Sequence, residues 1–293
     1  MSAKKKIAFI INPISGVGKK NTIPPLIEKY LDHQQFDYSI HYSQHRKHGY
    51  QIALEEKNTN AIIVAVGGDG SANEIGSALI NSNCALAIIP CGSGNGLARH
   101  ANIPLNHIKA IKHINLSAPK KIDTGKVNGH SFLGTCGFGF DGHIAKKFDH
   151  FHKRGFLSYV RLVLKEYKTY QPFTFNITTA TNSFERTALL CSVANSSQFG
   201  NGFTISPLSD LQDGKFELIF LSPLKWTRIL GVVRRFFNKR IHKSKHFESL
   251  IFENEIRIEL KNGSSTFFHL DGEPLDSASA FHIQILPASL MLI

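Results

Sequence analysis

The sequence predicts two domains, an α/β domain with a parallel sheet followed by a mainly antiparallel β-sandwich domain. In roughly the first 115 residues, short β-branched apolar runs alternate with helical patterns, which is typical of a parallel sheet covered by helices on both faces. After Pro119 strand candidates follow one another closely, which is typical of an antiparallel domain. We therefore expect one domain over residues 1–120 and another over residues 121–293, whose last strand can return to the first.

The elements of the first domain follow from their residue patterns. Strands are expected where apolar residues run together, and helices where apolar residues recur every three or four positions. In chain order the elements are a strand at Ile7–Asn12, a helix at Ile23–His33, a strand at Tyr38–Tyr42, a helix at Gly49–Glu56, a strand at Ala61–Val66, a helix at Asn73–Ile80 and a strand at Ala85–Ile89.

The second domain is read in the same way. Helical patterns occur at Phe156–Tyr167 and within Lys225–Lys245. Strands are expected at Lys120–Asn128, Ser131–Cys136, Thr174–Ala180, Ala188–Asn195, Phe216–Leu221, Ile256–Leu260, Thr266–Leu270 and Phe281–Pro287.

Composition bounds the possible classes of protein. The longest apolar runs are far shorter than the roughly 20 residues needed to cross a bilayer, and no export-signal pattern is visible at the amino terminus. Four cysteines without a CxxC pair fit free thiols in a reducing compartment, and fifteen histidines without an HExxH pattern fit no zinc site. We expect a cytoplasmic protein, soluble or peripheral at the inner face of the membrane.

Positive charge is concentrated in one segment. The chain carries 34 Lys and Arg against 22 Asp and Glu, a net charge of +12, and Lys225–Lys245 has no acidic residue. Its apolar residues recur at helical spacing, so it is either a helix lying on an anionic membrane or a packed helix with a solvated basic face. They are Trp226, Ile229, Leu230, Val233, Phe236, Phe237 and Ile241.

The most informative stretch is the glycine-rich turn within Val64–Glu74, between a strand and a helix. Glycines allow a sharp bend and close approach of a ligand, and amides at a helix start bind phosphate oxygens. An aspartate among them, Asp69, would repel a polyphosphate unless a metal ion lay between them. The pattern favours a nucleotide with Mg²⁺, and the alternative is a tight turn with Asp69 as a helix-start residue.

Two further turns have similar chemistry. Pro90–Arg99 follows another buried strand and contains three glycines and an asparagine, so that two turns could hold one ligand. Asn12–Lys19 follows the first strand and adds an amide side chain, a hydroxyl and a cation. It does not fit the GxxxxGK[ST] pattern, because Pro13 stands where the first glycine belongs.

Together these motifs resemble the lipid kinase family that includes diacylglycerol and sphingosine kinases, in particular its bacterial diacylglycerol-kinase-like branch. The likeness covers essentially the whole chain and includes, in the family's order, the three turns, Gly137–Asp141, Asp213-Gly214 and Asp271–Glu273. It implies a fold like those of NAD kinase and diacylglycerol kinase. It also implies ATP and Mg²⁺ as cofactors and transfer of the γ-phosphate of ATP to a hydroxyl of a membrane lipid.

The resemblance implies a nucleotide site between the two domains. Ser43 is a weak match to a further hydroxyl contact of the family. The implied nucleotide-binding residues are Asn12, Pro13, Ile14, Ser15, Gly16, Ser43, Gly67, Gly68, Asp69, Gly70, Ser71, Ala72, Asn73 and Ser93.

Late acidic residues carry the implied catalysis. Asp271 and Glu273 resemble the family's acidic pair, in which Glu273 would be the base for the acceptor hydroxyl. Asp69 is the third implied catalytic residue. Taken alone, Asp271-Gly272 is typical of a hairpin turn. Asp213 resembles the carboxylate of a bound, more structural than catalytic Mg²⁺, with Asp210 and Lys215 contributing backbone carbonyls. A simple turn is the alternative for that segment.

Three positions depart from the common bacterial pattern. Ser71 and Ser93 stand where many relatives have Thr, which keeps the hydroxyl, and Gly96 stands where many have Asp. The acceptor therefore stays open among diacylglycerol, a sphingoid base, ceramide and phosphatidylglycerol.

Three other functions compete with the lipid kinase. NAD kinase shares the Gly-Gly-Asp-Gly turn, and a non-catalytic lipid- or nucleic-acid-binding protein could keep the fold, although we expect no nucleic acid partner. Gly137–Gly142 literally fits the GxGxxG pattern of dinucleotide oxidoreductases, but it lies in mid-chain and is weak alone. The sequence does not indicate an oligomeric state.

Overall fold

The structure of this protein is a computed structural model that describes residues 3–14, 22–149 and 156–293. The described residues form two compact units. The first comprises the described residues up to Asp123 together with Pro287–Ile293, and the second comprises Thr124–Leu286. No helix among the described residues is long and apolar enough to span a membrane.

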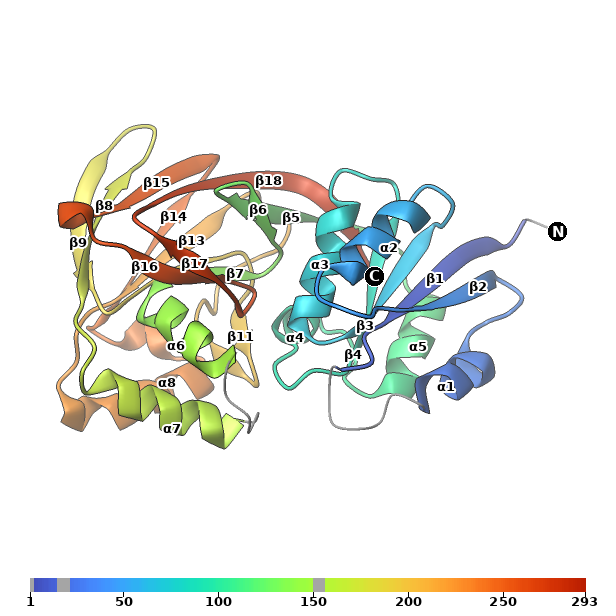
Figure 1. The fold of residues 1–293 in the computed structure, drawn as a ribbon, viewed down its shortest axis with the longest axis horizontal. Coiled ribbons are helices and arrows are strands. Elements are labelled where there is room, and N and C mark those ends of the chain that lie inside the picture. The colour runs from blue at the N-terminus through green and yellow to red at the C-terminus, as the bar shows by residue number, and fades with distance from the viewer. Residues whose placement is uncertain (1–2, 15–21, 150–155) are drawn as a thin grey trace. The chain divides into compact units, whose positions relative to one another are not determined.

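The first unit is a parallel sheet with helices on both faces, as the sequence predicts. Its strands have the order β2-β1-β3-β4, and β3 and β4 are buried along their whole length. Helices α1 and α5 lie on one face and α2 and α3 on the other (Figure 1). The elements are β1 (Lys5–Ile11), α1 (Ile23–Tyr30), β2 (Phe36–Tyr42), α2 (His48–Glu56), β3 (Ile62–Gly67), α3 (Asp69–Leu79), β4 (Ala85–Pro90), α4 (Gly96–His100) and α5 (His107–Leu116).

The carboxyl end of the chain completes this sheet. The last strand, β18 (Ala280–Leu292), begins in the second unit, and its end pairs in parallel with β4, with Met291 opposite Ala85 and Leu292 opposite Leu86. Leu290, Leu292 and Ile293 near the end of the chain are buried, and Ile293 joins the apolar core of the first unit.

The second unit is an antiparallel β-sandwich. One sheet has the strand order β14-β13-β10-β7-β16-β17, and in the other β15 pairs with β18 and β8, and β8 with β9. The strands are β5 (Lys120–Val127, which crosses the unit boundary), β6 (His130–Phe132), β7 (Thr135–Gly139), β8 (Phe173–Thr178), β9 (Ser183–Ala188), β10 (Leu190–Ala194), β11 (Gln198–Gly200), β12 (Phe203–Thr204), β13 (Phe216–Leu221), β14 (Phe247–Phe252), β15 (Glu255–Leu260), β16 (Thr266–Leu270) and β17 (Glu273–Ala278).

Helices cover the outer face of the six-stranded sheet (Figure 1). Strand β13 shows why this face is covered, because it carries apolar side chains on both of its faces. Phe216, Leu218 and Phe220 enter the sandwich core, whereas Ile219 and Leu221 join the core under the helices. The helices are α6 (Phe140–Asp149), α7 (Phe156–Tyr167) and α8 (Ile229–Phe237), with the 3-10 turns η2 (Trp226–Arg228), η3 (Ile241–Lys243) and η4 (Lys261–Gly263).

Two predicted elements need correction. The single strand predicted at Ser131–Cys136 is two strands, because the chain between β6 and β7 turns its amides toward Asp271 instead of a neighbouring strand. The helix predicted from Asn73 begins four residues earlier, at Asp69, so Gly70 and Ser71 belong to its first turn.

Candidate active site

Asp69 joins the two glycine-rich turns of the first unit. It is the first residue of α3, and its carboxylate oxygens accept hydrogen bonds from the backbone amides of Asn95 (2.7 Å) and Gly96 (2.6 Å) at the start of α4. Hydrogen bonds from amides to an ionised carboxylate are stronger than neutral ones. Asp69 therefore has a positioning role that its sequence context alone does not reveal.

Glycine is required where the two turns touch. A Cβ on Gly92 would lie 2.6 Å from the Cα of Gly68 and 2.9 Å from Oδ1 of Asn95. Asn95, in the left-handed region at φ 52°, closes the second turn by accepting from the Gly92 amide (3.0 Å) and donating to its carbonyl (2.7 Å). Asn95 was not among the predicted site residues, although an asparagine between glycines is a recognisable turn signal.

The polar residues after the first three strands gather at one edge of the sheet. Nδ2 of Asn12 donates to Oγ of Ser71 (3.2 Å), Oδ1 of Asn12 accepts from the Ile14 amide (2.9 Å), and the Ser43 amide donates to the carbonyl of Ile11 (3.0 Å). In an open α/β sheet this edge is where ligands bind.

The other predicted nucleotide residues lie around the same edge. Gly67 ends β3, Gly68 is the N-cap of α3, and Gly70 to Asn73 form its first turns. Ser93 is exposed within the second turn, and Pro13 follows Asn12. Ser15 and Gly16 lie outside the described residues.

Glu74 contacts the start of the neighbouring helix α2. Its Oε1 accepts from the amide of Lys47 (2.8 Å), the residue before α2, and its Oε2 lies so close to Gly49 that a Cβ there would be 3.0 Å away. A carboxylate at a helix start is stabilised by the helix dipole. The glutamate that follows Asn73 in the motif thus fixes the start of α2.

In the second unit, Asp271 and Gly272 form a tight hairpin turn. Leu270 pairs with Glu273 across the two-residue loop, and both loop residues have positive φ (49° and 86°), the signature of a type I′ turn. The hairpin reading of the sequence is therefore correct, and Glu273 is the first, half-buried residue of β17.

Three backbone amides hold the carboxylate of Asp271. Leu133 donates to Oδ2 (2.8 Å), and Gly134 and Thr135 donate to Oδ1 (2.8 and 2.9 Å), while the Asp271 amide donates to the carbonyl of Thr135 (2.8 Å). A carboxylate held in this way sets the position of its turn. The arrangement makes Asp271 a positioning residue beside Glu273.

A buried acid and histidine lie beneath this turn. Nε2 of His269 lies 2.8 Å from Oδ2 of Asp141, and Nδ1 of His269 accepts from the Gly272 amide (3.2 Å). Burial opposes the charged imidazole, but the charge of Asp141, its hydrogen bond to the ring and the charge of Asp271 together outweigh burial, so the pKa of His269 is raised. Asp141 belongs to the Gly137–Asp141 motif, whereas no sequence pattern indicates His269.

The glycines of Gly137–Gly142 are explained by packing. A Cβ on Gly137 would lie 2.5 Å from Nε2 of His269 and nearer still to Asp141, and a Cβ on Gly142 would overlap the carbonyl of Phe267 in β16. Gly139 ends β7 at φ 76°. The GxGxxG string therefore lets α6 pack directly on the sheet, and it lies outside the α/β unit where dinucleotide turns occur.

The predicted metal segment is a turn before β13. The amide of Gln212 donates to Oδ1 of Asp210 (3.0 Å) and that of Lys215 to Oδ1 of Asp213 (2.9 Å), while Nζ of Lys215 contacts Glu253 (3.0 Å). In the described parts of the chain, no three His, Cys, Asp or Glu side chains gather as metal ligands. The donors available in this turn are carboxylate and carbonyl oxygens, a set that suits Mg²⁺.

An apolar pocket lies within the second unit between the six-stranded sheet and its helices. Residues of α6, α7, α8, β10 and β13 line it, among them Ile144, Val163, Leu190 and Val232. Asp141 also lines it and is the acid that contacts His269. The lining is thus almost wholly apolar and includes one acidic residue, Asp141.

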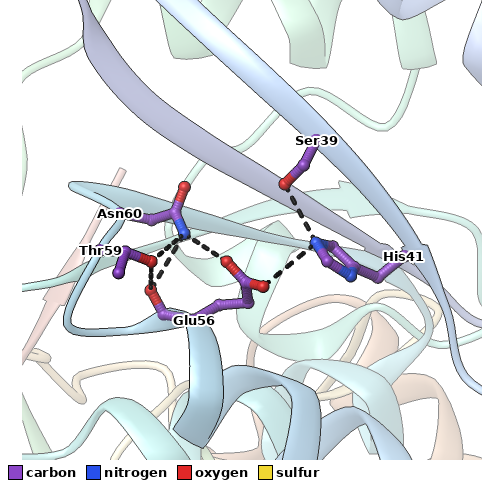
Figure 2. Close-up of polar contacts among 5 residues, drawn as sticks. All are labelled: Ser39, His41, Glu56, Thr59 and Asn60. Atoms are coloured by element: carbon purple, nitrogen blue, oxygen red, sulfur yellow. Dashed lines mark hydrogen bonds and ion pairs between the residues drawn. The ribbon is translucent and has the colours of Figure 1, made fainter.

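A Ser-His-Glu cluster on β2 and at the end of α2 has another purpose. Figure 2 shows Ser39, His41, Glu56, Thr59 and Asn60. Ser39 Oγ (3.0 Å) and Glu56 Oε1 (3.5 Å) both approach Nε2 of His41, whereas a catalytic triad needs one partner on each ring nitrogen. Asn60, which follows α2, donates to Glu56 Oε2 (2.7 Å). The contact between Glu56 and His41 therefore joins the end of α2 to β2.

The four cysteines, Cys84, Cys91, Cys136 and Cys191, are free thiols, as the sequence predicts. Burial raises the pKa of Cys84 to about 11 and those of Cys136 and Cys191 well above the usual range. These three buried thiols are therefore poor nucleophiles.

Comparison with known proteins identifies relatives for both units. A family model described as the diacylglycerol kinase catalytic domain matches residues 6–127, and one described as the YegS C-terminal NAD kinase beta sandwich-like domain matches residues 134–293. The lipid kinase YegS of Escherichia coli strain K12 is 30% identical over 239 residues, which covers 78% of this chain and 77% of that protein.

Two further comparisons agree. A "Probable lipid kinase YegS" of Escherichia fergusonii is 29% identical over 238 residues, covering 78% of this chain and 77% of that protein. The crystal structure of a diacylglycerol kinase from Bacillus anthracis strain Sterne matches with a TM-score of 0.75 at 22% identity, over 100% of this chain and 98% of that one. At that identity the structural match supports the fold alone.

Proposed function

The chain belongs to the diacylglycerol kinase catalytic-domain family, in its YegS-like lipid kinase branch, and on this premise we propose that it transfers the γ-phosphate of ATP to a hydroxyl of a membrane lipid. Family membership supports kinase chemistry on a lipid. The donor, the acceptor and the roles of individual residues are our proposals.

The first unit binds the nucleotide in this proposal. The first turn of α3 presents amides without intrahelical partners and the positive end of the helix dipole, both suited to phosphate oxygens. Asp69 keeps that turn against the second glycine-rich turn through its bonds to Asn95 and Gly96. Asn12, Ser43 and Ser71 add polar groups at the same edge of the sheet.

Mg²⁺ bound with ATP would neutralise charge on the phosphates during transfer. Asp69 is the carboxylate within the proposed phosphate-binding turn, and we expect it to orient the metal together with the phosphate oxygens. Asp213, with the backbone carbonyls of Asp210 and Lys215, would hold a separate structural ion.

Glu273 is the proposed general base. It takes the proton of the acceptor hydroxyl as that oxygen forms a bond to the γ-phosphorus and the bond from the γ-phosphorus to the bridging oxygen of ADP breaks. Asp271, fixed by three amides, sets the turn from which Glu273 projects. Preorganised position contributes more to such a reaction than a shifted pKa.

One observation carries the choice of a lipid acceptor: the apolar pocket shares Asp141 with the buried pair that contacts the Asp271-Gly272 turn. Asp141 lines the pocket and contacts His269, which accepts from the Gly272 amide next to Glu273. An acyl or sphingoid chain in the pocket would thus leave its polar end near Glu273. A cavity with an almost wholly apolar lining offers little to a dinucleotide.

The proposal is tested by labelled-phosphate transfer from ATP to diacylglycerol, sphingosine, ceramide, phosphatidylglycerol and NAD. We expect Glu273→Gln to lower the rate on the accepted lipid by about 10²- to 10⁴-fold, the usual contribution of a general base. Asp276→Asn is the matched control, because Asp276 lies on the same strand with a fully exposed carboxylate. It should stay within about twofold of native.

The other outcomes separate the rival functions. Labelling of NAD alone would make the chain an NAD kinase. Lipid binding without any labelled product would favour a non-catalytic lipid-binding protein, and equal rates for Glu273→Gln and the native protein would remove Glu273 as the base.

A further inference from the structure

The segment around α8 has two faces with different tasks. Ile229, Val232 and Phe236 are buried and line the apolar pocket. The opposite face is exposed, and there Trp226 (48% exposed) and Leu230 (73% exposed) lie one helical turn apart. Large apolar side chains that remain this exposed beside a packed helix indicate a contact surface.

Cations surround these two apolar side chains. All eight lysines and arginines between Lys225 and Lys245 are exposed, and the sequence between them has no acid. Arg161, Lys165 and Lys168, from α7 and the residue after it, are exposed as well, and Nζ of Lys168 lies 5.0 Å from the centre of the Trp226 ring. We call the surface formed by these eleven cations, Trp226 and Leu230 the basic face.

We infer that the basic face docks onto an anionic lipid bilayer, with Trp226 and Leu230 entering the interfacial layer. Cations around an exposed tryptophan and leucine match the headgroups and the upper acyl chains of such a membrane. A nucleic acid would match the cations and, through base stacking, Trp226, but it would leave the exposed Leu230 without an apolar partner. Docking would also place α8, one wall of the pocket, against the source of the lipid; this last step rests on the proposed function.

Trp226 makes a direct probe because it is the chain's only tryptophan. The experiment records its fluorescence, without ATP, with vesicles of phosphatidylglycerol and phosphatidylcholine, with pure phosphatidylcholine vesicles and with single-stranded RNA. We expect a blue shift and quenching by brominated acyl chains with the anionic vesicles alone, weakened by added salt.

Lys225→Gln/Arg234→Gln should weaken vesicle binding about thirtyfold, since each cation near an anionic surface contributes about 1 kcal/mol and 1.4 kcal/mol is a factor of ten. The control, Lys5→Gln/Lys109→Gln, removes the same charge from exposed positions of the first unit and should stay within about twofold. Equal weakening by both variants, no change in Trp226 fluorescence, or binding to RNA in place of vesicles would overturn the inference.

Lipid dispersed in detergent separates this inference from the proposed function. The Lys225→Gln/Arg234→Gln variant should phosphorylate such lipid at the native rate. Vesicle docking by a protein that phosphorylates no lipid would sink the proposed function and leave docking intact. Native kinase activity without docking would sink the docking inference and leave the proposed function intact.

Discussion

Asp69 and Asp271 are held in the same way, by backbone amides of a segment distant in the sequence. Asp69 receives two such bonds from residues 26 and 27 positions later, and Asp271 receives three from residues more than 130 positions earlier. Each carboxylate therefore fixes the shape of a loop as well as its own direction. Motif patterns show both acids and allow each a place in a turn, but they do not show these distant partners.

Asp69→Asn should destabilise the first unit. An asparagine keeps one oxygen and turns an NH₂ group toward one of the two amides, which leaves two donors facing each other. We expect the free energy of unfolding to fall by about 1–3 kcal/mol, the usual cost of losing a hydrogen bond to a charged group. Urea denaturation measures this loss, and ATP binding should weaken in parallel.

Asp37→Asn is the matched control. Asp37 is exposed and forms an exposed ion pair with Lys4, so the loss of its charge should change stability by less than about 0.5 kcal/mol. If Asp69→Asn abolishes phosphate transfer while stability is unchanged, its role lies with metal and phosphate and not with holding the turns.

At the scale of elements, the sequence predicts well those strands whose two faces are both apolar, and poorly those at the edges. Phe216–Leu221 has the predicted bounds because its three alternate residues from Phe216 enter one core, whereas Ile219 and Leu221 enter a second. Ser183–Ala188 pairs with one neighbour, and only Phe184 and Ala188 in it are apolar, so its sequence carries little strand signal. The packing of α6 and the role of His269 depend on contacts between distant segments and could not be predicted.

Two glycine-to-alanine changes in helices should have opposite effects. Gly142→Ala in α6 places a Cβ 2.6 Å from the Cα of Phe268 and closer to the Phe267 carbonyl, so we expect a loss of at least about 1–3 kcal/mol in stability. Gly231→Ala in α8 meets no atom within 4 Å and should gain about 0.5–1 kcal/mol through helix propensity. Urea denaturation midpoints compare them. Equal losses would contradict the close packing of α6 on β16.

At the scale of the whole molecule, the chain begins and ends in the same unit. Residues Pro287–Ile293 belong to the first unit although the whole of the second unit precedes them. Leu292 pairs with Leu86, Ile293 donates to the Leu86 carbonyl (2.9 Å), and Asn81 donates to the Ser289 carbonyl (2.7 Å). The sheet of the first unit therefore gains its strand beside β4 only from residues that follow the second unit in the sequence.

Leu292→Ala tests this dependence. Leu292 is 5% exposed, so we expect a loss of about 2–4 kcal/mol from the cavity that it leaves. Because stability is local to cooperative units, hydrogen exchange should rise in β3 and β4 more than in β10 and β13. Ile251→Ala on β14, where the side chain is 68% exposed, is the control and should change neither region. Faster exchange in β10 and β13 alone would show that the last strand stabilises the second unit and not the first.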